Sequence, residues 1–200
     1  VESMLLSDTA IPVMDLLEGA NTSFQSHAVI TSMLASHMTR IMGWSSKKNI
    51  QIVVIGAFLH DIGLFKIPKE LQAMTYRSII KESDQVAYQR HVFEGYELVK
   101  SIKGIPHEVS TIVLQHHEDA KGAGYPQGLL KSDIFPLARL VSLVDVFLGE
   151  LEKLPLEKRK GHLTDVLDKI VKADQLSYDA GDVRVLTIAL EEPDLKKARM

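Results

Sequence analysis

The sequence predicts an all-α fold, a bundle of helices, and three observations support this class. Apolar residues recur at steps of three and four along most of the 200-residue chain, which is the spacing of one helix face. Residues 50–59 are rich enough in β-branched side chains to form a buried strand, but no second strand-like run offers a partner, so a helix is favoured. Histidines and aspartates also recur at intervals of about one helix plus its connection.

The first part of the chain predicts two helices before that ambiguous segment. Residues 3–18 form the first, which we interpret as part of an N-terminal helical connector (residues 1–20) ahead of one large domain (residues 21–200). A polar Asn-Thr-Ser run at 21–23 offers N-caps for the second helix, and Gly43 with the serine pair at 45–46 ends it. One face of this helix carries Phe24, His27, Thr31, Leu34, Met38 and Ile41.

Glycines and prolines divide the rest of the chain. Gly63 and Pro68 break it, and the polar, weakly patterned residues 69–83 predict a mobile flap. A helix closed by Gly104 follows, with one face formed by His91, Gly95, Leu98 and Ile102.

Two prolines open the next helices. Pro106 stands at the first turn of a helix. One face of this helix carries Val109, Ile112, Val113 and His116. Residues 119–135 form a long loop rich in glycine, of a length that usually has a function. Residues 156–192 predict two more amphipathic helices with a polar break near residues 179–182. Between them, Pro136 begins a helix whose stripe is Leu137, Leu140, Val141, Val144, Asp145 and Leu148.

Composition excludes several classes of protein. The 46% hydrophobic and 24% charged residues are those of a globular domain with ample core. The absence of cysteine removes disulfides and thiolate ligands, leaves His, Asp and Glu for metal binding, and suits a cytoplasmic location. No apolar run reaches the roughly 18 residues of a membrane span and no secretory leader is evident, so we expect no membrane segment. The net charge of -3 argues against DNA binding.

Seven side chains form a candidate metal site. A buried carboxylate or imidazole is costly unless it is paired or coordinated, and bound metal ions satisfy several at once. Alone, a histidine on an apolar stripe is more often a satisfied core residue, a His-Asp dipeptide arises by chance, and a His-His-Glu run can be a polar helix end. The joint pattern favours metal coordination. The candidate ligands are His27, His60, Asp61, His91, His116, His117 and Asp145.

The spacing of these residues predicts how they meet. Successive intervals of 33, 31, 25 and 28 residues each correspond to one helix and its connection, so each helix contributes one inward-facing ligand or one adjacent pair. Seven donors suit two divalent ions about 3.5–4 Å apart, with Asp61 as the bridging carboxylate. His37, His107 and His162 fit no stripe and are interpreted as surface residues.

Four motifs in this chain resemble those of a known family. They are HDIG at 60–63, HHE at 116–118, GAGYPQGL at 122–129 and IFPLARLVSLVDVF at 134–147. From about residue 21 to 150, the ordered set resembles the HD-GYP domain, a branch of the HD phosphohydrolase superfamily. The resemblance implies an HD-type helical bundle with a dinuclear metal site at its centre, the same seven ligands, and hydrolysis of cyclic di-GMP.

The resemblance also implies cofactors and partners. Members bind two or three metals, and some hold the third through a Glu one turn before the first ligand; Ser23 stands there in this chain, so we expect two divalent ions, iron first and manganese second. A hydroxide bridging them would attack the phosphodiester and release a linear dinucleotide or a mononucleotide. The first helix either couples to an upstream sensor or receiver domain or mediates a homodimer, and a GGDEF-type domain is a further candidate partner.

The chain departs from the family where substrate phosphates are expected. Leu64 follows HDIG where the family usually has Lys, and Leu154 stands where an Arg is usual. Losing two charge-assisted contacts, at roughly 1.5–3 kcal/mol each, weakens binding by a factor of roughly hundreds or more. Lys66, expected to point elsewhere, and Lys121, where the family has Asp, are candidate replacements.

Two more residues complete the candidate substrate site. Tyr125 either lines the site or a partner surface, or it pins the glycine-rich loop to the bundle, and the two interpretations are equally favoured. Arg139 either faces a phosphate or pairs with an acidic side chain, and pairing is favoured.

Three functions follow, in the order in which the sequence favours them. The first is a metal-dependent phosphodiesterase of a cyclic dinucleotide. The second is a degenerate, weakly active or inactive metal-binding signalling module that binds a nucleotide or a partner domain, motivated by the lost phosphate contacts. The third is an HD phosphohydrolase for another nucleotide or phosphoester.

Overall fold

The regular structure in the described part of the chain is helical. The computed structural model describes residues 24–72, 80–173 and 177–195. Within these residues, the strand-type pairing is limited to an isolated antiparallel bridge between Lys121 and Leu130. The α-helices are α3 (Phe24–Ile41), α4 (Lys47–Leu59), α5 (Lys69–Gln72), α6 (Glu82–Ser101), α7 (His107–Gln115), α8 (Pro136–Leu151), α9 (Leu156–Arg159), α10 (Leu163–Ala173) and α11 (Ala180–Leu195), and the 3-10 turns are η1 (Ile62–Lys66) and η2 (Lys160–His162).

Most of the predicted helices are confirmed, including the ambiguous one. Residues 50–59 lie in α4, whose N-cap Ser46 accepts a 3.1 Å hydrogen bond from the backbone N–H of Asn49. Pro136 is the first residue of α8, and Pro106 caps α7. The helix predicted over residues 3–18, the cap candidates at 21–23 and the connector at 1–20 lie outside the described residues.

Three local details differ from the helices that the sequence predicts. Within the flap predicted over residues 69–83, residues 69–72 form α5 and residues 82–83 begin α6, and the mobility of this segment stays a prediction. Ile102 does not continue the apolar face of α6, because the chain becomes extended there and turns at Gly104 with a φ of 87°, which leaves Ile102 49% exposed. The break predicted near residues 179–182 ends at Asp179, because α11 begins at Ala180; Asp182 lies in the first turn of α11, where it is 2% exposed and pairs with Arg139.

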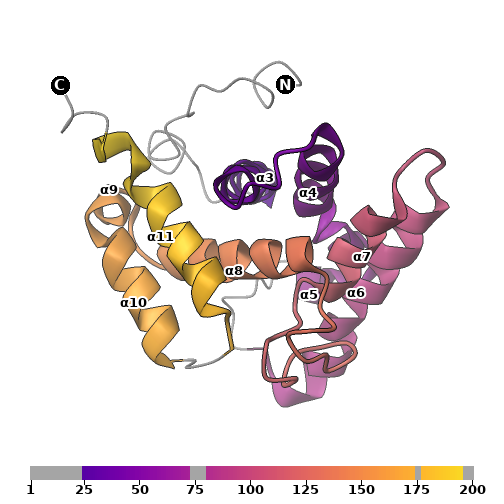
Figure 1. Ribbon diagram of the computed structural model, residues 1–200. Coiled ribbons are helices and arrows are strands. Elements are labelled where there is room, and N and C mark those ends of the chain that lie inside the picture. The colour runs from indigo at the N-terminus through magenta and orange to yellow at the C-terminus, as the bar shows by residue number, and fades with distance from the viewer. Residues whose placement is uncertain (1–23, 73–79, 174–176, 196–200) are drawn as a thin grey trace.

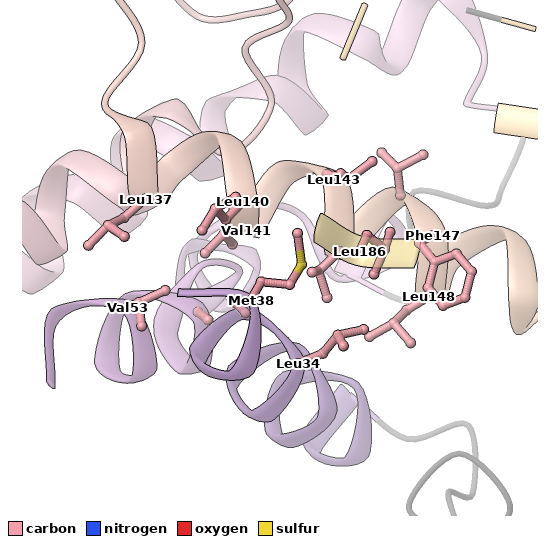
Figure 2. Packing of buried hydrophobic residues seen from close by; sticks show 14 of the residues in the cluster. Leu34, Met38, Val53, Leu137, Leu140, Val141, Leu143, Phe147, Leu148 and Leu186 are labelled. Carbon is pink, nitrogen blue, oxygen red and sulfur yellow. The ribbon is translucent and has the colours of Figure 1, made fainter. Parts of the chain in front are cut away.

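Helix α8 forms the centre of the core. It is apolar on nearly every side, as expected of a helix surrounded by protein. Figure 1 shows it crossing the middle of the molecule, with α10 and α11 beside its C-terminal half and α7 near its N-terminal end. Leu34 and Met38 of α3 and Leu186 of α11 face it, as Figure 2 shows, and all three are fully buried. Residues near the middle of α8 are therefore enclosed by packed side chains.

One segment departs from the expectation that no stretch is long and apolar enough for a membrane. Residues Lys47–Lys66 meet that criterion by length and composition. However, α4 ends at Leu59 after 13 residues, about 20 Å of helix, whereas a bilayer core is about 30 Å thick. The helix also packs against α3 and α7. Its apolar character is explained by its place in the core.

Candidate metal centre

The fold gathers the seven predicted ligands into two adjoining clusters. In each cluster, the nitrogen and carboxylate oxygen atoms lie within 4.8 Å of one another. The side chains come from α3, from the residues that directly follow α4 and α7, from α6 and from α8. One cluster is His27, His60 and Asp145, and the other is Asp61, His91, His116 and His117.

Three histidines are oriented by the helices on which they stand. The Nδ1 atoms of His60, His91 and His116 lie 2.6, 2.7 and 2.8 Å from the carbonyl oxygens three residues earlier, at Ala57, Tyr88 and Val113. A carbonyl only accepts, so each Nδ1 carries the proton and donates it. Each Nε2 therefore presents a lone pair to the centre, which is the form of imidazole that binds a metal.

Asp61 stands between the clusters. Its Oδ2 lies 3.4 Å from Nε2 of His60, and its Oδ1 lies 3.4 Å from Nε2 of His91 and 3.5 Å from Nε2 of His116. The two carboxylate oxygens thus address different clusters. This arrangement suits a carboxylate that bridges two cations.

The opposite end of the centre is held by helix α8. Nε2 of His27 lies 3.0 Å from Oδ1 of Asp145, and its Nδ1 lies 3.2 Å from Oε1 of Glu152. Asp145 Oδ1 is also 3.8 Å from Nε2 of His60. Residues more than 100 positions apart in the sequence thus meet in the first cluster.

The unsatisfied atoms of the centre fit bound cations. Among the described residues, Nε2 of His60, His91 and His116 and Oδ1 of Asp61 are buried without a hydrogen-bond partner. Native proteins rarely leave such atoms unpaired, because each costs about 1–3 kcal/mol. All four are lone-pair donors directed at the same space, so metal ions satisfy them together. The two His/Asp clusters are consistent with a dinuclear metal site.

The protonation states also suit metal binding. Burial raises the pKa of Asp61, but the electrostatic interaction with His60 and the other imidazoles around it outweighs burial and holds that pKa well below its usual range. Burial lowers the pKa of His91 to about 4 and that of His117 well below its usual value. Near neutral pH, Asp61 is therefore ionised and these two histidines are neutral, as ligands must be.

His60 behaves differently. Burial lowers its pKa, but the carboxylates of Asp61 and Asp145 outweigh burial, so the pKa is raised. The two carboxylates thus attract positive charge to this position. A metal cation supplies that charge in place of the proton.

Two glycines allow the backbone to close around the ligands. A Cβ on Gly63 would lie 1.9 Å from the carbonyl oxygen of His91 and 2.5 Å from the backbone nitrogen of Gly95, so η1 rests directly on α6. A Cβ on Gly124 would lie 2.5 Å from the carbonyl oxygen of His117. The glycines of the HDIG and GYP motifs are therefore required by close approach to the segments that carry the ligands.

The 119–135 loop is fastened to the histidine pair. Glu118, 3% exposed, accepts hydrogen bonds from the backbone N–H groups of Gln127 at 2.6 Å and Leu129 at 2.8 Å. The ring of Tyr125 stacks on that of His117, with centroids 4.7 Å apart. Tyr125 therefore lies at the candidate site, and its contact with substrate stays a prediction.

The far side of this loop is tied to the segment before α11. The backbone N–H of Ala120 donates to the carbonyl of Ser177 at 2.9 Å, and Lys131 pairs with Asp179. Arg139 donates to Asp182 at 3.0 Å and to the carbonyl of Lys131 at 3.4 Å. The favoured interpretation of Arg139, pairing with an acidic side chain, is confirmed.

The remaining predicted residues lie away from the clusters. Lys66 and Lys121 are exposed, and their role as phosphate contacts stays a prediction. Leu64 packs into a small apolar cluster with Ile67, Leu71 and Tyr88. His107 and His162 are exposed, as predicted, whereas His37 is half-buried; none of the three belongs to a cluster of metal-binding type among the described residues.

Two residues that contact the site were not predicted to do so. Glu118 was given no role of its own beyond the alternative that the His-His-Glu run is a polar helix end, yet it is buried and holds the loop. Glu152 was not singled out, although it stands seven residues after Asp145 and so on the same face of α8. That spacing is the signal that would have found it.

Comparison with known proteins agrees with this geometry. A family profile described as "HD domain" matches residues 12–181. The chain is 32% identical over 114 residues to the cyclic di-GMP phosphodiesterase response regulator RpfG of Xanthomonas campestris, covering 56% of this chain and 30% of that protein. It is 26% identical over 125 residues to the 3'3'-cGAMP-specific phosphodiesterase 1 of Vibrio cholerae, covering 60% of this chain and 27% of that protein. The chain spans less than a third of the length of either relative.

Solved structures share the fold. Bd1817, a HDG"Y"P protein from Bdellovibrio bacteriovorus, matches with a TM-score of 0.73 at 24% identity, over 90% of this chain and 56% of that one. The HD domain of the phosphodiesterase PgpH from L. monocytogenes matches with a TM-score of 0.56 at 15% identity, over 95% of this chain and all (100%) of that one. The predicted all-α, HD-type fold is confirmed.

Proposed function

The chain belongs to the HD domain family, and from this premise we propose that it is a metal-dependent phosphodiesterase that hydrolyses a cyclic dinucleotide, cyclic di-GMP being the first candidate. The single observation that carries the proposal is the set of buried, unpaired Nε2 and carboxylate atoms that converge in two adjoining clusters. Support for the substrate class comes from the relatives, whose names describe phosphodiesterases of cyclic di-GMP and of 3'3'-cGAMP.

Each cluster is proposed to hold one divalent ion. His27, His60 and Asp145 hold one, and His91, His116 and His117 hold the other, with Asp61 between them. Iron is the first candidate metal and manganese the second. When bound, the two ions supply an activated water-derived nucleophile and neutralise the charge that develops on the phosphate.

The protein's own residues then prepare the reaction. The carbonyls of Ala57, Tyr88 and Val113 each accept Nδ1–H of one imidazole, so that Nε2 of His60, His91 and His116 faces the centre. Glu118 holds the loop that carries Tyr125 against His117, which limits water on that side. Lys66 and Lys121 are the exposed cations proposed to meet phosphate. Arg139 is the less favoured candidate for this role, because its guanidinium pairs with Asp182.

The test is hydrolysis by protein loaded with iron or manganese. Cyclic di-GMP and 3'3'-cGAMP are incubated with the holoprotein, and linear dinucleotides and mononucleotides are separated by chromatography. We expect product with at least one metal, and a loss of at least about 100-fold in Asp61→Asn. A wild-type protein that holds two ions and cleaves neither nucleotide would refute the proposal.

A second candidate is a metal-binding signalling module with little or no hydrolysis. The observation in its favour is that Leu64 is buried in a separate cluster, while Leu154 is a half-buried part of the core. Neither position offers a charge to a phosphate. Under this alternative, calorimetry detects binding of cyclic di-GMP or of a partner domain without turnover. Hydrolysis of another phosphoester, such as bis-p-nitrophenyl phosphate, would instead support the third function.

The cellular setting stays a proposal as well. We propose a cytoplasmic location, an upstream sensor or receiver domain, a GGDEF-type partner and a homodimer as the associations to test. Size-exclusion chromatography with light scattering measures the dimer directly.

A further inference from the structure

His27 is held in a different way from the histidines beside it. His60, His91 and His116 each donate Nδ1–H to a neutral backbone carbonyl. His27 instead has a carboxylate on that side, Oε1 of Glu152 at 3.2 Å, and the Glu152 side chain is only 7% exposed. Glu152 belongs to neither of the two candidate metal clusters.

Helix α8 places two carboxylates on one imidazole. Asp145 and Glu152 are seven residues apart, which is two helical turns and about 10.5 Å along the axis. They therefore share a face of the helix, and the His27 ring lies between their oxygen atoms, with Nε2 toward Asp145 and Nδ1 toward Glu152. Asp145 is on the metal side of the ring, and Glu152 is on the outer side.

The backbone of Glu152 is itself well fixed. It is the C-cap of α8, and its N–H donates to the carbonyl of Leu148 at 2.8 Å. Its carbonyl accepts from the guanidinium of Arg159 at 3.5 Å, and Nε of that side chain donates to the carbonyl of Leu154 at 3.2 Å. Arg159 is 4% exposed. The carboxylate thus starts from a fixed point of the fold.

We propose that Glu152 is a positioning residue which accepts Nδ1–H of His27, fixes the tautomer in which Nε2 faces the centre, and strengthens the hold of the His27–His60–Asp145 cluster on its cation. A carboxylate in this outer position makes an imidazole a stronger ligand than a carbonyl does, and removing such a partner typically costs roughly 10- to 100-fold in metal affinity. The inference rests on the metal ligation in the proposed function, but not on the identity of the substrate.

The experiment measures metal affinity, with manganese as the probe and a competing chelator to resolve the two ions. The variants are Glu152→Ala, Glu152→Gln, His27→Ala and the double variant of His27 and Glu152. Glu150→Gln is the matched control, since Glu150 lies on the same helix but pairs with the exposed Lys153 and Lys169 and not with His27. Circular dichroism of the metal-free proteins checks folding, and Glu152→Gln serves if the alanine variant does not fold.

We expect Glu152→Ala to weaken one ion by about 10- to 100-fold and to leave the other unchanged, with a smaller loss in Glu152→Gln. In the His27→Ala background, removing Glu152 should have no further effect on affinity, because the ring through which it acts is gone. Wild-type affinity for both ions in Glu152→Gln and Glu152→Ala would overturn the inference, as would equal weakening of both. These outcomes are independent of turnover, so a wild-type protein that binds two ions without hydrolysis refutes the proposed function alone.

Discussion

Replacing Gly63 by alanine should separate η1 from α6 and disturb the metal centre. The added Cβ would lie 1.9 Å from the carbonyl oxygen of His91, whereas ordinary contact begins at 3.4 Å. The two backbones must therefore move apart by about 1.5 Å, since neither is a flexible side-chain end. Asp61 lies two residues before the substitution and His91 is on the other side of the contact. A misplacement of about 1 Å at such a centre costs roughly 100-fold in rate.

We expect Gly63→Ala to lose about 1–3 kcal/mol of folding free energy. We also expect it to bind the ion proposed for the cluster of Asp61 and His91 at least about 10-fold more weakly. Urea unfolding of the metal-free protein and chelator competition of the loaded protein measure the two effects. Gly161→Ala is the control, because a Cβ there meets no atom within 4 Å and should change stability by less than about 1 kcal/mol. Wild-type stability and metal affinity in Gly63→Ala would show that the close approach does not position Asp61.

Three further predictions concern the loop, the protonation of the centre and the core. Glu118→Gln should release the 127–129 backbone and increase amide exchange there, and unchanged exchange would show that the carboxylate does not hold the loop. Burial, opposed by Asp61, lowers the pKa of His91 to about 4. Between pH 6.5 and 4 the unfolded metal-free protein therefore binds more protons than the folded protein does. The free energy of unfolding should fall as the pH falls through this window, by up to about 3 kcal/mol. Denaturant unfolding at several pH values tests this, and a slope that persists unchanged in His91→Gln would contradict it. Leu34→Ala should cost about 3–5 kcal/mol in the same unfolding assay because Leu34 is fully buried, whereas Leu156→Ala, at a position 43% exposed, should cost less than about 1.5 kcal/mol.

Sequence reasoning found the residues that converge because each shows a local conflict. An imidazole or carboxylate in an apolar stripe, as at His91 or Asp145, is visible without knowing what it faces. The class of fold was equally accessible, since helical periodicity is local. Residues 50–59 needed one non-local consideration, the lack of a pairing strand, and that was sufficient.

The missed features depend on partners far away in the sequence. Asp182 resembles a loop residue until Arg139, 43 positions earlier, is known to neutralise it. Glu152 resembles a solvated helix end, because its partner His27 is 125 positions away. The direction of Leu64 could not be predicted either, since it depends on the small apolar cluster around Tyr88. Contacts of this kind are set by tertiary packing and not by local propensity.

The ties between the 119–135 loop and residues 177–182 have a practical consequence. Because Ser177, Asp179 and Asp182 each hold part of that loop or the helix after it, the loop and the start of α11 should move as one piece. A fragment cut after α10 would keep every proposed ligand yet leave the loop unsupported on one side. Conversely, a binding event on α11 should alter the position of the glycine-rich loop, which connects this helix to the candidate metal centre.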